Sequence, residues 1–197
     1  MKVIFLDNDG VICLAQNWGS RKKKRQKAYG WYDHPSSALM PVEYRFDNFD
    51  VKAVKILNQI LEQTGAEIVV SSDWRFHASL SELGDYYESK GIIKRPIDTT
   101  AKFADIFPKE WSNLRFRAEL ELERSMEIQH WLGNHPEVTH WVAVDDLNMS
   151  VEFLGERFSA SDESDDELGL TNFVWTSRDY EGIKQCGIKD KIIKYLS

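Results

Sequence analysis

The sequence contains few cysteines and no long hydrophobic run. Its 197 residues include two cysteines, Cys13 and Cys186, which lie too far apart to form a CxxC metal pair and are too few for a disulfide framework. Both are expected to be free thiols of a reducing compartment. No apolar run approaches the ~20 residues that a membrane helix requires. Asp7 and Asp9 interrupt the apolar N-terminal run where a signal peptide would continue, so a cytoplasmic protein without a membrane segment is expected.

Charge is unevenly distributed along the chain. The net charge is −7, yet residues 20–27 (SRKKKRQK) hold six of the 25 basic residues, and residues 161–167 (SDESDDE) hold five of the 32 acidic ones. Blocks of like charge are usually solvated and mobile and less often serve as interaction surfaces. The five histidines show no metal-ligand spacing with Cys or with one another, so surface or core roles are expected for them.

Apolar runs alternate with amphipathic segments along the chain. Short β-branched runs predict strands, and apolar residues at spacings of three and four predict helices. Asp47, Asn48 and Asp50 are alternative N-caps for the first of these helices, and Gly65 lies where its C-cap belongs. Strands separated by helices predict an α/β fold, a doubly wound parallel sheet with helices on both faces. The expected strands are 2–6, 66–72, 140–146 and 172–176, and the expected helices are about 49–64, 80–90, 118–132 and 183–196.

Three predicted strands end in polar residues able to perform chemistry. These residues are the DNDG sequence at 7–10, the SSD sequence at 71–73 and the acid pair at 145–146. The carboxyl ends of parallel strands meet at one edge of a sheet, which is where α/β proteins bind ligands. For one Asp alone, a turn or a helix cap is an equally good interpretation, but three such strand ends together predict an active site.

The acidic residues at these strand ends suggest a cation site. Asp7 and Asp9 are two residues apart, so their carboxylates point the same way in extended backbone. Asp145 and Asp146 are adjacent and can both face the site only if the strand ends there. Clustered carboxylates repel one another unless a cation neutralises them. Oxygen ligands with open positions suit Mg²⁺.

The motifs resemble those of the haloacid dehalogenase (HAD) superfamily. IFLDNDGV resembles the first HAD motif, IVVSS the second and WVAVDD the fourth, and Arg124 in ERSMEIQHWL best matches the third, a lone Lys or Arg. A closer resemblance is to the HAD domain of Swiss army knife RNA-repair proteins. Four segments carry it: TGAEIVVSSDWR, the Arg-x-x-Glu-Ile-x-x-Trp-Leu pattern, WVAVDD and GLT. This likeness covers most of residues 1–12, 48–93, 118–149 and 168–197.

The resemblance implies a HAD-type phosphatase. Asp7 would attack phosphorus and form an aspartyl phosphate, and Asp9 would protonate the leaving alcohol and later activate water. Mg²⁺ would be held by Asp7, by the main-chain carbonyl of Asp9 and by the Asp145/Asp146 pair.

The same resemblance assigns the phosphate-binding residues. Ser71, with Ser72 as the alternative, would hydrogen-bond the phosphoryl oxygens, and Arg124 would offset their charge. A surface ion pair on a Glu-rich helix is the alternative for Arg124. Arg75 either reaches the substrate phosphate or pairs with Asp73 at a helix start.

The chain is expected to form one HAD-like domain, 1–197, with two inserted segments. HAD proteins commonly insert a cap after the first motif, and residues of about 13–47 fill that position. The segment interleaves basic residues with aromatic ones, as single-strand nucleic-acid surfaces do. Its candidate contacts are Lys22, Lys23, Lys24, Arg25 and Trp31. The alternative is a small cap whose aromatic residues pack together beside a solvated basic loop. Residues of about 159–167 are expected to form a disordered acidic loop.

These features predict a magnesium-dependent phosphomonoesterase whose substrate is a phosphorylated nucleic acid or nucleotide. One alternative is a phosphatase of small phosphorylated metabolites. The other is a catalytically inactive HAD fold that binds nucleic acid. No protein partner can be inferred.

Overall fold

A five-stranded, all-parallel sheet forms the centre of the computed structural model, which describes residues 1–30, 39–107, 120–158 and 168–197. The strand order is β3-β2-β1-β4-β5, and each neighbouring pair runs parallel. The strands are β1 (Lys2–Leu6), β2 (Glu67–Val70), β3 (Asp98–Thr99), β4 (His140–Asp145) and β5 (Phe173–Trp175). The predicted fold class, α/β with a doubly wound parallel sheet, is confirmed.

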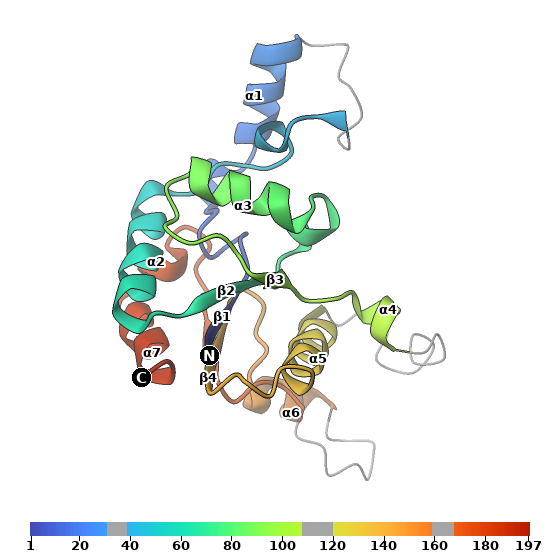
Figure 1. Cartoon of the computed structure of the whole chain (residues 1–197), viewed down its shortest axis with the longest axis vertical. Coiled ribbons are helices and arrows are strands. Elements are labelled where there is room, and N and C mark those ends of the chain that lie inside the picture. The colour runs from blue at the N-terminus through green and yellow to red at the C-terminus, as the bar shows by residue number, and fades with distance from the viewer. Residues whose placement is uncertain (31–38, 108–119, 159–167) are drawn as a thin grey trace.

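Helices cover both faces of this sheet (Figure 1). On one side lie α2 and α7, on the other α5 and α6, while α3 lies above β2 in this view and α1 projects from one end of the molecule (Figure 1). The helices are α1 (Ser20–Tyr29), α2 (Val51–Thr64), α3 (Leu80–Ser89), α4 (Phe103–Ile106), α5 (Leu120–Gly133), α6 (Val151–Phe158) and α7 (Ile188–Tyr195). No helix among these residues is long and apolar enough to cross a membrane.

The central strand β1 is buried on both faces. Ile4 and Leu6 belong to the core shared with α2, α3 and α7. Val3 and Phe5 face the opposite way, where the Phe5 ring packs edge-on against Trp131 of α5 with ring centroids 5.2 Å apart. Because alternate residues of a strand point to opposite faces, one apolar run supports both helical layers.

Local capping fixes the position of α2. Of the three candidate N-caps, Asp50 is the one observed: its carboxylate accepts a hydrogen bond from the Ala53 amide at 2.9 Å. The helix ends at Gly65, whose φ of 70° is the left-handed conformation that glycine adopts without strain.

The structure corrects the sequence prediction in three places. Residues 20–29 form the helix α1 instead of a mobile loop. The predicted helix 183–196 is divided into a 3₁₀ turn (Gly182–Lys184) and α7, because Gly187 between them has a φ of 81° that no helix continues through. β3, α4 and α6 were not predicted: β3 is two residues long, α4 is four residues long, and α6 immediately precedes the acidic block, which lies outside the described residues.

Packing of α2 against the sheet predicts the first stability effect. Leu57 is completely buried, so Leu57→Ala should lower the free energy of unfolding by about 2–5 kcal/mol through lost contacts and a residual cavity. Urea denaturation measures this change. Lys55→Ala, on the exposed face of the same helix, should change the value by less than about 0.5 kcal/mol. Equal losses in the two variants would contradict the placement of the core.

Candidate active site

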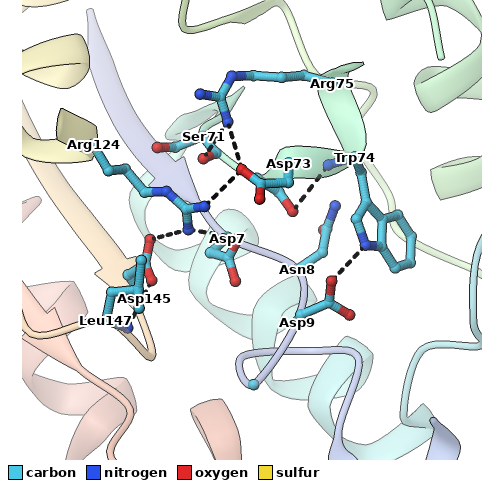
Figure 2. A network of polar contacts seen from close by, with 12 residues as sticks. Asp7, Asn8, Asp9, Ser71, Asp73, Trp74, Arg75, Arg124, Asp145 and Leu147 are labelled. Atoms are coloured by element: carbon cyan, nitrogen blue, oxygen red, sulfur yellow. Dashed lines mark hydrogen bonds and ion pairs between the residues drawn. The ribbon is translucent and has the colours of Figure 1, made fainter. Parts of the chain in front are cut away.

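The candidate site lies at the carboxyl ends of β1, β2 and β4. The Asp7 amide donates to the Val144 carbonyl at 3.1 Å, and the Ser71 amide donates to the Leu6 carbonyl at 3.0 Å. These two bonds continue the parallel ladder just beyond the strands, so they hold the three strand ends in register. Figure 2 shows the side chains of Asp7, Ser71 and Asp145 gathered there.

Three carboxylates form a compact cluster. One oxygen from each of Asp7, Asp145 and Asp146 lies within 4.8 Å of the others, and the first two side chains are buried. Burial, reinforced by the charge of Asp145, raises the pKa of Asp7 well above its usual range and brings the pKa of Asp146 to about 7. An all-oxygen donor set under this mutual repulsion fits a hard divalent cation such as Mg²⁺.

Gly10 makes room for this cluster. A Cβ atom at this position would lie 2.3 Å from Oδ2 of Asp146, and the φ of 70° disfavours any other residue. The carboxylate of Asp146 therefore approaches the backbone of the turn after β1. The turn itself is tight, because the Asn8 carbonyl accepts hydrogen bonds from the amides of Val11, Ile12 and Cys13.

Asp9 lies beside the cluster, but its carboxylate turns toward Trp74 (Figure 2). The indole Nε1 of Trp74 donates to Oδ2 of Asp9 at 2.8 Å. Trp74 is itself fixed between Phe46 and Phe49, with ring centroids 4.3 Å and 5.2 Å away. Burial raises the pKa of Asp9, and the Trp74 hydrogen bond offsets part of that shift. The structure thus separates Asp9 from the side chains of the acidic cluster.

Arg124 reaches into the site from α5. Its guanidinium contacts Oδ1 of Asp7 at 3.1 Å, Oδ2 of Asp145 at 3.0 Å and Oδ1 of Asp73 at 2.9 Å. Burial alone would lower the pKa of Arg124, but the carboxylates of Asp145 and Asp7 raise it, so the charge is retained. Of the two interpretations of its sequence, the site position is the one observed.

Arg75 is placed behind the site. Its NH1 donates to the Ser71 carbonyl at 2.8 Å, and its NH2 pairs with Glu127 of α5 at 2.5 Å. Glu127 also accepts from the Phe103 amide at 2.7 Å. Asp73, one of the two alternatives for Arg75 in the sequence, also forms an ion pair with it, with Nη1 and Oδ1 3.8 Å apart. This arrangement connects the strand end at Ser71 to α5 and leaves Arg75 with an exposed side-chain fraction of 3%.

The two serines differ in their surroundings. The Ser72 hydroxyl accepts from the Trp74 amide at 3.5 Å and caps the 3₁₀ turn Asp73–Phe76. The Ser71 hydroxyl is buried without a hydrogen-bond partner among the described residues. A buried hydroxyl without a partner is costly, so Ser71 is the serine poised to bind an incoming oxygen atom.

The basic residues proposed as nucleic-acid contacts are not equivalent. Lys24 donates to the Phe46 carbonyl at 2.8 Å, and Arg25 donates to the Tyr44 carbonyl at 2.6 Å, so both anchor α1 to the segment that follows it. Lys22 and Lys23 are exposed. Trp31 lies outside the described residues.

Sequence reasoning missed the partners that orient the site. Trp74, Glu127 and Tyr87 each bond a site residue, the last through its hydroxyl to Oδ1 of Asn8 at 2.7 Å. Trp74 lies within the SSDWR sequence and Glu127 within the ERSME sequence. Their closeness in sequence to Asp73 and Arg124 was the feature that could have identified them as partners of the site.

Comparison with known families gives one match. Residues 3–173 match the model of the HAD domain in Swiss Army Knife RNA repair proteins. Comparisons with curated proteins and with solved structures gave no match. The matched span begins in β1, ends in β5 and includes every residue of the acidic cluster and Arg124. The chain therefore belongs to the family of HAD domains in Swiss Army Knife RNA repair proteins.

Proposed function

We propose that the chain is a magnesium-dependent phosphomonoesterase that acts on nucleic-acid ends or nucleotides through an aspartyl-phosphate intermediate. The arrangement around Asp7 carries the proposal: a buried carboxylate, a cationic Arg124 at 3.1 Å and, at the adjacent strand end, the Ser71 hydroxyl, which has no hydrogen-bond partner in the described part of the chain. Membership of a HAD family supports a HAD-type hydrolase, and its description as an RNA-repair family supports a nucleic-acid substrate.

The proposed reaction has two steps. An oxygen of Asp7 forms a bond to phosphorus while the bond to the ester oxygen breaks, and Asp9 gives its proton to that leaving oxygen. Water then attacks the phosphorus of the acyl phosphate, Asp9 takes its proton, and the bond to Asp7 breaks to release inorganic phosphate. The raised pKa of Asp9 suits a carboxyl that must carry a proton in the first step.

The remaining residues bind and orient. The Ser71 hydroxyl would donate to a phosphoryl oxygen, and Arg124 would balance the negative charge on Asp7 and on the phosphoryl group. Asp7, Asp145 and Asp146, with the main-chain carbonyl of Asp9, would hold Mg²⁺, which when bound supplies charge neutralisation between two anionic reactants. We assign Arg75 a positioning role, because its polar contacts are with the Ser71 carbonyl, Glu127 and Asp73.

The nucleophile is tested by Asp7→Asn. The amide keeps the size of the side chain but is a poor nucleophile, so phosphate release should fall by more than about 1000-fold while the circular dichroism spectrum stays unchanged. Colorimetric phosphate assays with phosphorylated oligonucleotides, mononucleotides, sugar phosphates and an aryl phosphate measure the loss. Near-normal turnover in the folded variant would contradict the mechanism. A wild-type protein that hydrolyses none of these esters would favour an inactive binding module.

The acid is tested by Asp9→Asn, whose amide oxygen can still accept the Trp74 hydrogen bond. Esters with poor leaving groups need a proton and should slow by about 100- to 10,000-fold. p-Nitrophenyl phosphate needs little protonation and should slow far less. A series of aryl and alkyl phosphates measures the difference, and equal losses across the series would show that Asp9 is structural.

The metal site is tested by thermal unfolding with and without Mg²⁺. Binding to the folded state alone should stabilise the wild type by about 2.7 kcal/mol at 100 times Kd, which corresponds to a rise in Tm of roughly 5–10 °C. Asp146→Asn removes one ligand and one repelling charge. It should therefore have a higher Tm than the wild type in EDTA and should respond little to Mg²⁺. The same Mg²⁺ response in both proteins would exclude Asp146 from the site.

A further inference from the structure

A cavity lies between the start of α1 and the aromatic residue that holds Asp9. Its volume is about 440 Å³, within the range of small-ligand pockets, and its walls include Asp9, Trp18, Arg21, Lys22, Asp47 and Trp74. Trp74 forms part of the wall and donates to Asp9 at 2.8 Å. The cavity therefore opens directly onto the carboxyl that we assign as the acid.

The position of Asp9 indicates which part of a substrate would enter this cavity. A general acid must lie within hydrogen-bond distance of the oxygen that it protonates. Asp7, on the opposite side of the reacting phosphorus, would take the phosphoryl group. The group attached to the leaving oxygen is thus directed toward the space beside Asp9, Trp18 and Trp74.

Trp18 presents a fixed aromatic ring to this space. Its indole Nε1 donates to the Cys13 carbonyl at 3.3 Å, which orients the ring, yet the residue keeps an exposed fraction of 48%. Cys13 is buried in the turn that follows the DNDG sequence, so the ring is anchored to the same turn that carries Asp9. An oriented and exposed indole offers a stacking face to a planar group.

Lys22 places an exposed positive charge at the cavity. Asp47 is the one carboxylate besides Asp9 in the described lining, and it accepts from the Arg21 amide at 2.6 Å and the Ser20 hydroxyl at 3.2 Å. The negative charge of Asp47 is therefore partly compensated by these hydrogen bonds at the N-terminus of α1. The Arg21 side chain is 53% exposed but forms an ion pair with Asp47, with Nε and Oδ2 3.7 Å apart, whereas Lys22 is exposed and has no acidic partner within ion-pair distance among the described residues.

We propose that this cavity is the leaving-group subsite and that it binds the terminal nucleoside of a single-stranded nucleic acid. The base stacks on Trp18, the scissile phosphate lies between Asp7 and Asp9, and the next backbone phosphate lies against Lys22 and Arg21. This inference rests on the proposed phosphatase function. It replaces the larger basic surface expected from the sequence, because Lys24 and Arg25 bond to main-chain carbonyls.

The stacking contact is tested with Trp18→Ala and Trp18→Phe. The substrates are a terminally phosphorylated RNA tetranucleotide, with the phosphate at whichever end the wild type hydrolyses, and glycerol 2-phosphate, whose leaving group has no ring that could stack. Loss of one stacked base should raise KM for the tetranucleotide by about 5- to 140-fold in Trp18→Ala. KM for glycerol 2-phosphate should stay within about twofold of the wild type, and Trp18→Phe should restore most of the tetranucleotide affinity.

The phosphate contact is tested with Lys22→Ser and a matched control on the same helix, Lys27→Ser, which is exposed and lies outside the cavity. Each single-strand phosphate that is neutralised contributes roughly 0.7 to the slope of log affinity against log salt. Binding of the tetranucleotide to each variant in the Asp7→Asn background measures this slope. Lys22→Ser should lower it by roughly 0.7, while Lys27→Ser should leave it unchanged.

Three outcomes would overturn the subsite. Trp18→Ala could leave KM for the tetranucleotide unchanged, it could raise KM equally for both substrates, or the two lysine variants could share one salt slope. The Trp18 variants are measured in active protein, and the two lysine variants with Asp7 intact are checked for phosphate release, so each of these results leaves the proposed phosphatase function intact. A wild-type protein that hydrolyses neither substrate would instead remove the proposed function, and the subsite with it.

Discussion

The compensation of buried negative charge at Asp7 and Asp145 is the constraint on which the site depends. The two carboxylates follow neighbouring parallel strands and cannot move apart without breaking the sheet. Arg124 lies 3.1 Å and 3.0 Å from them and compensates part of this charge, while Asp146 adds a third carboxylate that favours a cation. Removing one partner of such a buried group leaves an unpaired charge, which costs far more than the pair contributes. This requirement explains why α5, which carries Arg124, is linked a second time to the strand end at Ser71 through Arg75 and Glu127.

The sequence was sufficient to predict the sheet and the convergence of its strand ends, but not which side chains contact one another at the site. β1, β2 and β4 are apolar runs that end in carboxylates or serines. Their parallel pairing brings those ends together independently of the side-chain conformations. The direction of a long side chain is different, because it depends on partners distant in sequence. Arg75 turns to Glu127, 52 residues away, and Trp74 turns to Asp9, 65 residues away. The sequence pattern also failed to predict the break at Gly187, because a glycine in an amphipathic run is compatible both with a continuous helix and with a helix boundary.

The basic segment shows how a charge run divides into structural and exposed residues. α1 has no buried residue, so little apolar packing holds it in place. Asp47 accepts from its first turn, and Lys24 and Arg25 bond to the carbonyls of Phe46 and Tyr44. The cations that remain exposed near its start lie beside Trp18 and the cavity that reaches Asp9. The segment after β1 thus connects the proposed acid, an exposed aromatic ring and an exposed lysine.

The central claim is that Asp7 becomes phosphorylated during turnover. The most direct measurement is acid quenching of a single turnover with substrate labelled at its phosphoryl group, followed by proteolysis and mass spectrometry of the labelled peptide. The account predicts that the label is attached to Asp7 in the N-terminal peptide, and that hydroxylamine, which cleaves acyl phosphates, removes it. Label on another residue, or product formed at the full rate with no covalent intermediate at any quench time, would contradict the account.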